Sequence, residues 1–304
     1  MVFKSIGVIQ SDPIEIRIVG NRGTIVHNGR MSRTLLLLFA HPDDETFLTG
    51  GIACRYSSEG VRVVLATATL GESGKPGIPP VCTPEELPAV RERELRTAVE
   101  LLGIAEVHLL GYRDRELASA PPDLIREQLV GLVRACRPQV VVSFDPNGGN
   151  LHPDHVAISR FAIDAVTAAA DARWFPSSGR AHSVDRLVWG LGKRPWLLAR
   201  DGDLKTTPGV DFAVDVRAWR DRKAAALRAH ATQHQSAERN FFAQPDCDRL
   251  LGLEVFRQAF GPRLSRRPLD DLFGGLGPAT DLVNPTDNVS SDFVGSGRRR
   301  SRLR

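Results

Sequence analysis

Two short segments of this 304-residue chain are rich in histidine and acidic residues, the residue types that bind metal ions and transfer protons. Residues 40–45 read Ala-His-Pro-Asp-Asp-Glu, and residues 152–155 read His-Pro-Asp-His. A catalytic zinc ion takes about three ligands from His, Asp or Glu and keeps a further position for water or substrate. The two segments hold that many ligands and leave carboxylates and an imidazole over for acid–base catalysis. Their composition therefore indicates a metal-dependent hydrolase.

Each segment follows a short apolar run that predicts a buried strand. Residues 34–39 and 140–144 are almost continuously apolar, which is typical of strands covered on both faces in a parallel sheet. The turn-rich loop 145–150 then leads from the second run to the second segment. Ligands of open α/β sheets bind at the carboxyl ends of the strands, so we expect the two segments to converge there.

Apolar periodicity predicts alternating strands and helices over most of the chain. We expect strands near residues 34–39, 61–67, 106–110, 139–144, 186–191 and 211–216, and helices near 46–58, 84–102, 122–136, 154–170, 217–232 and 248–260. This order predicts an α/β fold with a Rossmann-like, mostly parallel sheet flanked by helices on both faces. No Gly/Ser linker interrupts residues 33–260, so we expect a single domain.

The two ends of the chain differ from its middle in composition. We expect residues 1–30 to be a poorly ordered extension, residues 31–265 to form the domain, and residues 266–304 to be a disordered basic tail. The last seven residues carry five arginines, against a formal net charge of +4, so the remainder carries about −1. A loose arginine tail is usually a solvated terminus, and we do not expect nucleic-acid binding.

Other features of the composition bear on the compartment. No apolar stretch reaches the roughly 20 residues of a membrane-spanning helix, so we do not expect membrane insertion. Cys54, Cys82, Cys136 and Cys247 are widely spaced and predict free thiols in a reducing cytoplasm. We therefore expect a cytoplasmic protein; the sequence permits a homo-oligomer without requiring one.

The two segments, with Asn147-Gly148-Gly149 ahead of the second, resemble the LmbE/PIG-L family of zinc-dependent N-deacetylases, which includes the mycothiol-precursor deacetylases. Further similarities lie in Gly50-Gly51, in residues 69–74 and in residues 111–114. Each motif alone is unspecific, but five in the family's order, across residues 33–260, are specific. The resemblance implies removal of an N-acetyl group from a GlcNAc-type sugar or glycoside, with a zinc-bound water attacking the amide carbonyl.

The resemblance also implies metal ligands and catalytic residues. His41, Asp44 and His155 match the family's metal ligands; a set of two histidines and one carboxylate suits Zn²⁺ and can also hold Fe²⁺. Asp43 matches the general base that takes a proton from the attacking water and can return it to the leaving amine.

Two residues of the second segment are expected to assist catalysis. His152 is the candidate for stabilising the oxyanion, with a structural role as the alternative. Asp154 would orient an imidazole and keep it charged, although it could instead cap the helix that follows Pro153.

Further polar residues have less specific expectations. Arg91 and Asp114 match positions that hold sugar hydroxyls, and a surface salt bridge is the alternative for both. Glu72 would line the pocket or cap a loop. Glu45 would order the loop beneath the metal and is given no catalytic step. His230 could reach the site, or could simply sit favourably at a helix end.

Departures from family patterns bear on the substrate. Mycothiol-precursor deacetylases often carry an aromatic hydroxyl where this chain has Asn150 and Leu151, which weakens the expectation that a tyrosine helps to bind the oxyanion. Related amidases of thiol conjugates tend to have a lysine where this chain has Phe47-Leu48-Thr49, which weakens that alternative. A non-catalytic Rossmann-like binding module would need a Gly-rich turn after the first strand, and residues 41–45 supply carboxylates there instead.

Overall fold

The computed structural model describes residues 17–19, 33–192, 195–197 and 203–277. The expected N-terminal extension therefore lies outside the described residues except for strand β1 (Arg17–Val19), whose backbone pairs with the edge of the sheet. Most of the expected C-terminal tail also lies outside them.

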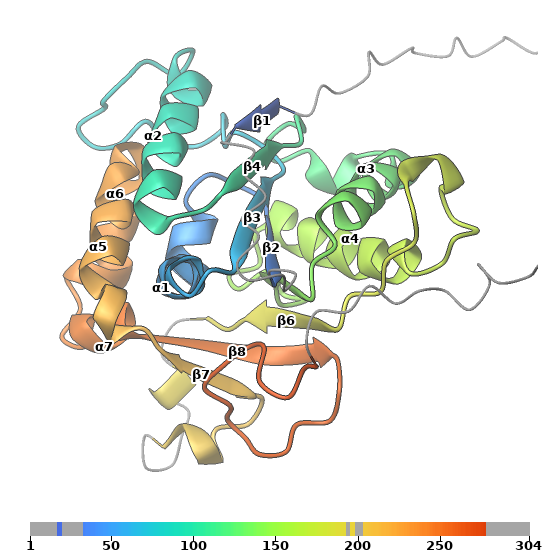
Figure 1. Ribbon diagram of the computed structural model, residues 1–304. Coiled ribbons are helices and arrows are strands. Elements are labelled where there is room, and N and C mark those ends of the chain that lie inside the picture. Colours follow the sequence, from blue (N-terminus) through green and yellow to red (C-terminus); the bar gives the residue numbers. More distant parts are fainter. Residues whose placement is uncertain (1–16, 20–32, 193–194, 198–202, 278–304) are drawn as a thin grey trace, which may run out of the picture.

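An eight-stranded sheet forms the centre of the molecule, with the order β1-β4-β3-β2-β5-β6-β8-β7 (Figure 1). Its remaining strands are β2 (Thr34–Phe39), β3 (Arg62–Thr67), β4 (Glu106–Leu109), β5 (Val140–Phe144), β6 (Arg186–Gly190), β7 (Phe212–Asp215) and β8 (Leu253–Phe260). Strands β4, β3, β2, β5 and β6 pair in parallel, whereas β1, β7 and β8 pair antiparallel with their neighbours. The expected Rossmann-like, mostly parallel sheet is confirmed.

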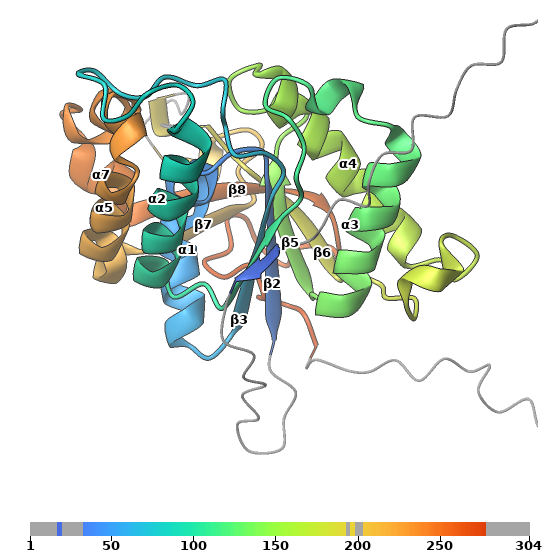
Figure 2. The same ribbon diagram turned by 90° about the horizontal axis from the view of Figure 1, so that it is seen from above.

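Helices cover both faces of the sheet (Figure 2). One face carries α1 (Asp44–Ser58), α2 (Leu87–Leu102), α5 (Arg220–Ala229), α6 (His234–Ala237) and α7 (Cys247–Gly252), and the other carries α3 (Pro122–Cys136) and α4 (Pro153–Ala169). Single turns lie between them at Leu117–Ser119, Pro176–Ser178, Pro195–Leu197, Leu204–Thr206, Arg217–Trp219, Ala231–Gln233 and Glu238–Phe242. This layering is what the alternating pattern predicts.

The helix predicted over residues 248–260 is wrong beyond residue 252. Residues Leu253–Phe260 form β8, which inserts between β6 and β7. Val255 and Phe256 are buried there, and the carboxylate of Glu254 is satisfied by groups from distant helices. Pairing with two strands that are remote in sequence decides this segment, because tertiary context overrides local propensity.

The boundary predicted at residue 265 also needs correction within the described residues. Leu269, Leu272 and Phe273 are buried in the core. The backbone of Leu269 bonds to that of Asp211 and Ala213 beside β7. The packed part of the chain therefore extends past residue 265, although its Pro- and Gly-rich composition suggested a tail.

The order of the strands reverses at the expected place. Strand β2 is wholly buried, and the chain runs from it to β3 and β4 on one side before returning to β5 and β6 on the other. The direction of winding reverses between β2 and β5, and ligands of such sheets bind outside the carboxyl ends of the strands at this switch point. Both acidic-histidine segments begin there.

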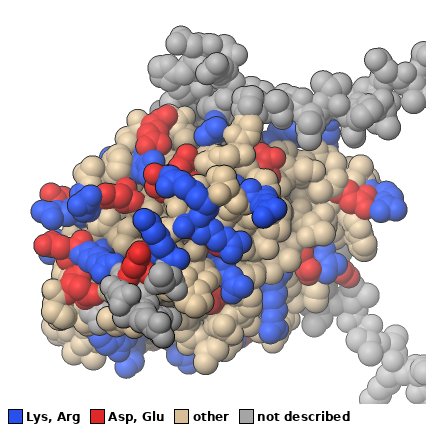
Figure 3. All heavy atoms as spheres, turned by 90° about the horizontal axis from the view of Figure 1, so that it is seen from below, with Lys and Arg blue, Asp and Glu red and all other residues tan. Residues whose placement is uncertain are grey.

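The described residues also bear on the compositional expectations. None of the described helices has the length and hydropathy needed to cross a membrane. All four cysteines lie in described parts of the chain and are unpaired. Charged side chains of both signs share the face in Figure 3, with lysine and arginine gathered near its centre.

Candidate metal centre and active site

The loops after β2 and β5 bring the three predicted metal ligands together. His41 lies just beyond β2, whereas Asp44 and His155 lie in the first turns of α1 and α4. Nδ1 of His41 is 3.0 Å from Nε2 of His155 and 3.7 Å from Oδ2 of Asp44, and the other oxygen of Asp44, Oδ1, is 3.4 Å from Nε2 of His155. Ligands at about 2.1 Å from a tetrahedral ion are about 3.4 Å apart, so the spacing fits one zinc ion.

The outward-facing nitrogen of each histidine is held by a second group. His155 contacts the carbonyl of Gly148 through Nδ1 at 3.0 Å, which leaves Nε2 facing the cluster. His41 contacts Asp114 and Asp154 through Nε2, at 3.0 and 3.3 Å, which leaves Nδ1 facing the cluster. Such partners fix the ring orientation and tautomer of metal-binding histidines, so both rings are oriented in advance of metal binding.

The electrostatic surroundings favour a cation. Burial and the charge of His41 lower the pKa of His155 to about 4, which keeps it in the neutral form that metal binding requires. Burial alone would lower the pKa of His41, but hydrogen bonds to Asp114 and Asp154 and the charge of Asp44 raise it to about 10. The carboxylates that favour a positive charge on His41 would attract a divalent cation in the same way.

His152 lies at the rim of this cluster as the N-cap of α4. Its ring is 4.8 Å from that of His41, and it forms with His41 and His155 a group of donors that lie within 4.8 Å of one another. The Nδ1 atom accepts the backbone N–H of Asp154 at 3.3 Å, so the neutral ring carries its proton on Nε2. Burial and the neighbouring histidines lower the pKa of His152. It can therefore act as a neutral hydrogen-bond donor at neutral pH.

The carboxylate of Asp154 contacts His41 and the backbone instead of His152. It accepts hydrogen bonds from the N–H groups of Arg115 and Leu117, at 2.6 and 3.2 Å, and lies 3.3 Å from Nε2 of His41. The side chain is fully buried. The imidazole that Asp154 orients is thus a predicted metal ligand, and the helix cap expected as its alternative role belongs to His152.

Asp43 lies between the ligands His41 and Asp44 and has an unusual backbone conformation, with φ at 115°. Its side chain is 16% exposed, and Oδ2 is 3.5 Å from Nη2 of Arg91. Burial raises the pKa of Asp43 to about 6, against the opposing charge of Arg91. A carboxylate that titrates near neutrality suits a general base, and the charge of Asp43 acts on His155 within the same cluster.

Comparisons with known proteins show the family to which the chain belongs. A family model described as PIG-L, GlcNAc-PI de-N-acetylase, matches residues 36–166. A Geodermatophilus obscurus protein, 1D-myo-inositol 2-acetamido-2-deoxy-alpha-D-glucopyranoside deacetylase, is 37% identical over 290 residues, covering 81% of this chain and 98% of the relative. The chain belongs to the PIG-L family.

Solved structures resemble this PIG-L family protein in fold. The conserved protein TT1542 from Thermus thermophilus has a TM-score of 0.60 at 28% identity, covering 77% of this chain and 97% of its own. The N,N'-diacetylchitobiose deacetylase from Pyrococcus horikoshii has a TM-score of 0.58 at 23% identity, with 83% and 89% covered. The second likeness is one of fold alone.

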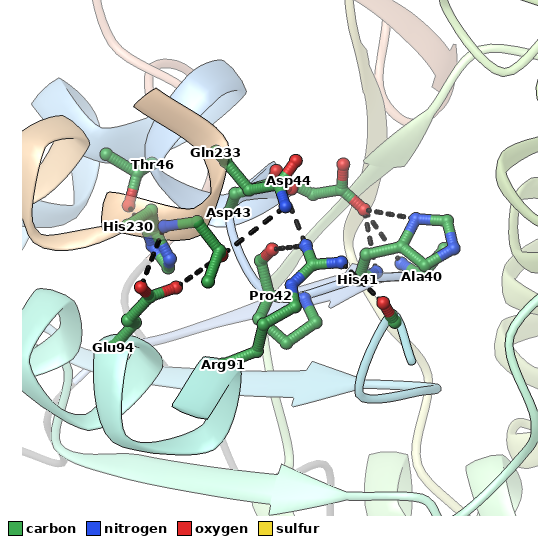
Figure 4. A network of polar contacts seen from close by, with 12 residues as sticks. Ala40, His41, Pro42, Asp43, Asp44, Thr46, Arg91, Glu94, His230 and Gln233 are labelled. Atoms are coloured by element: carbon green, nitrogen blue, oxygen red, sulfur yellow. Dashed lines mark hydrogen bonds and ion pairs between the residues drawn. The ribbon is translucent and has the colours of Figure 1, made fainter. Parts of the chain in front are cut away.

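Arg91 occupies a different environment from the one expected of a substrate-binding residue. It is buried and donates hydrogen bonds to the carbonyl groups of Gly71, at 2.9 Å, and Pro42 (Figure 4). It thereby joins the loop after β2 to the loop after β3 and lies against Asp43. The alternative of a surface salt bridge is wrong, and a contact with sugar stays a prediction.

Asp114 is likewise buried and engaged with protein groups. Besides its contact with His41, it accepts the N–H of Ser73 at 3.0 Å, and its own N–H donates to Glu72 at 2.9 Å. Burial would raise the pKa of Asp114, but the contacts with His41 hold it well below the usual range. Asp114 is no surface residue, its contact with sugar stays a prediction, and Glu72 acts here as a loop cap.

The sequence connected Glu45 with the loop beneath the metal and left the role of His230 open, and the structure joins the two residues. Nε2 of His230 lies 2.8 Å from Oε1 of Glu45, and both side chains are fully buried. They are 185 positions apart, so no local pattern could pair them. The available signals were a carboxylate without a catalytic step and a histidine at the end of a predicted helix.

Proposed function

We propose that the protein removes the N-acetyl group from 1D-myo-inositol 2-acetamido-2-deoxy-α-D-glucopyranoside, a GlcNAc-type glycoside, by hydrolysis. The observation that carries the proposal is the cluster of His41, Asp44 and His155, whose donor atoms are 3.0 to 3.7 Å apart. Asp43 lies in the chain between the ligands His41 and Asp44, and His152 has a ring nitrogen within 4.8 Å of those of His41 and His155. The name of the relative that is 37% identical supports the choice of substrate.

Zn²⁺ is the metal that the three donors fit, and Fe²⁺ is the alternative for the same set. A bound Zn²⁺ would polarise the amide carbonyl and lower the pKa of water to about 7. Asp114 and Asp154 hold the ring of His41, and the carbonyl of Gly148 holds that of His155, so the donors are oriented in advance.

The protein's own groups account for the proton transfers. Asp43 takes a proton from the attacking water, since its raised pKa makes it a stronger base than an exposed carboxylate. The Nε2–H of His152 donates to the oxygen that becomes negative when water adds to the amide carbon. As the C–N bond breaks, Asp43 returns the proton to the leaving amine, and the products are acetate and the free amino sugar.

The test combines elemental analysis with acetate release from this glycoside, with and without a chelator. We expect near-stoichiometric zinc and acetate release that the chelator abolishes. His41→Ala and His155→Ala should lose both metal and activity. His182→Ala is the matched control, because His182 contacts Pro138 just before β5 begins, at the amino end of that strand and therefore opposite the candidate site. Metal binding without acetate release would contradict the proposed reaction.

A further inference from the structure

The conformation of Asp43 requires an explanation that the reaction does not give. Its φ of 115° and ψ of −34° lie where side chains other than glycine are rarely found. The very next residue begins α1, and the N–H groups of Thr46 and Phe47 in that helix bond to the carbonyl of Asp43. Such conformations persist only where surrounding contacts determine them, and they cluster at functional sites.

One contact holds the backbone of Asp43 from the protein interior. Its N–H donates to Oε2 of Glu45 at 3.0 Å. The other oxygen of Glu45 is itself held, at 2.5 Å by the hydroxyl of Thr46 and at 2.8 Å by Nε2 of His230. Figure 4 shows His230 and Thr46 beside the Asp43 loop, on the side away from His41. A chain of hydrogen bonds thus runs from the end of α5 to the backbone of Asp43.

The complete burial of Glu45 and His230 indicates that this pair has a specific role. Removing a carboxylate and an imidazole from water costs several kcal/mol per ion unless good geometry compensates it, and hydrophobic residues often pack equally well. Glu45 and His230 are both 0% exposed, so neither can touch a substrate. What Glu45 does reach is the backbone N–H that lies between two predicted metal ligands.

We propose that Glu45 and His230 are positioning residues for Asp43: they hold its backbone in the positive-φ conformation from which its carboxylate acts as the base beside the metal ligands. The inference rests on the proposed function, in which Asp43 is the general base. His230 acts through Glu45, and Glu45 acts through the N–H of Asp43. Without either residue the carboxylate of Asp43 is still present, but its position relative to the metal ligands is no longer fixed.

The contacts of His230 suggest a decisive pair of variants. Only Nε2 of its ring is used, because Nδ1 has no hydrogen-bond partner among the described residues. His230→Gln can place an amide N–H near the position of Nε2, whereas His230→Leu fills similar space without a donor. We expect His230→Gln to retain most of the activity and His230→Leu to lower kcat by roughly 10- to 100-fold. KM and bound zinc should be unchanged in both.

A double-mutant cycle with Asp43 separates positioning from general stability. Glu45→Gln removes one of the two acceptor oxygens, so it should lower kcat substantially in the wild-type background. In the Asp43→Asn background, where the base is already absent, the same change should cost no more than about twofold. A merely structural role would lower activity by the same factor in both backgrounds.

Lys223 supplies the matched control. It lies in α5, seven positions before His230, and forms a buried ion pair with Glu254 at 2.7 Å that also braces α1. Lys223→Met should therefore reduce stability while changing kcat by about twofold or less in either background. If His230→Leu does not fold, Glu45→Gln and His230→Gln still carry the comparison.

The results distinguish a failure of this inference from a failure of the proposed function. Full additivity, or equal losses in His230→Gln and His230→Leu, would overturn the inference while leaving the deacetylase function intact. Absence of acetate release from the wild-type protein would instead contradict the proposed function. In that case hydrogen exchange at the Asp43 amide decides: exchange accelerated relative to amides of β2 in His230→Leu, but not in Lys223→Met, supports the inference, and equal exchange overturns it.

Discussion

Two buried acid–base pairs join α1 to the C-terminal third of the chain, and they fix different parts of the backbone. The pair of Glu45 and His230 lies at the N-terminus of α1 and ends on the backbone of Asp43. The pair of Lys223 and Glu254 lies against the middle of α1, although neither residue belongs to that helix. Lys223 and His230, the cationic partners, lie in α5 or at its C-terminal end. One helix therefore supports both the loop that carries Asp43 and the packing of α1.

The second pair explains how closely α1 approaches its neighbours. The carboxylate of Glu254 accepts the N–H groups of Gly51 and Ile52 at 2.7 and 2.8 Å. A Cβ atom on Gly51 would come within 2.4 Å of the side chain of Val216, so only glycine fits there. The comparison teaches that similar burial and chemistry serve packing in one place and aim a reactive group in the other.

The largest expected effect separates the reacting residue from both pairs. Asp43→Asn removes the proposed base, so kcat should fall by about 10²- to 10⁴-fold while zinc stays bound. The measurement is kcat together with zinc per chain. If zinc is lost to the same extent as in His155→Ala, then Asp43 is a metal ligand, and its assignment as the general base is wrong.

The next effect is on stability. Lys223→Met leaves the charge of Glu254 buried without its partner, so the free energy of unfolding should fall by about 3–5 kcal/mol. Adding Glu254→Gln removes that charge and should recover part of the loss. Urea unfolding measures both. A fall in kcat as large as that expected for His230→Leu would show that the two pairs do not differ in function.

A pH-dependent effect sharpens the account of Asp43. Its pKa is raised to about 6 in the folded protein, so the folded state binds this proton more tightly than the unfolded chain. That contribution favours folding at low pH and is lost as the pH rises through about 6. Metal-free Asp43→Asn should therefore gain stability over wild type between about pH 4 and 7, by up to about 3 kcal/mol.

The control for this pH effect is a carboxyl in water. Asp123 has a side chain that is 90% exposed. Asp123→Asn should follow the wild-type stability across the same pH range. Parallel curves for Asp43→Asn and wild type would remove burial of Asp43 as a factor.

The smallest effect concerns the backbone of Asp43 alone. Asp43→Gly and Asp43→Ala both lack the carboxylate, but at φ 115° only alanine is strained, by about 1–2 kcal/mol. The glycine variant should therefore be the more stable by about 0.5–1 kcal/mol after its greater unfolded-state entropy is subtracted. Thermal unfolding provides the comparison. At Asp123, in the first turn of α3, the order should reverse.

Local patterns were enough for the central part of the fold. The apolar runs ahead of His41 and Asp145 predicted β2 and β5, because a strand buried on both faces has few polar positions. Placing polar segments after two parallel strands then predicted their convergence at the switch point. The predicted ligands His41, Asp44 and His155 do meet there.

Long-range packing settled which distant groups pair. Residues 253–260 have a helix-compatible composition but form β8, because β6 and β7 offer unpaired edges on both sides. Leu269 to Phe273 pack on the core despite a tail-like composition. Asp154 turned out to hold His41, and His230 to hold Glu45.

The parallel strands, the ligand types and the family could be predicted from the chain alone, since these depend on residues that are neighbours in sequence. Which carboxylate holds which imidazole, and why Asp43 can keep a strained backbone, depend on contacts across 113 and 185 positions. Such contacts form only once the order of the strands has brought their elements together, and hydrophobic packing, not local pattern, sets that order.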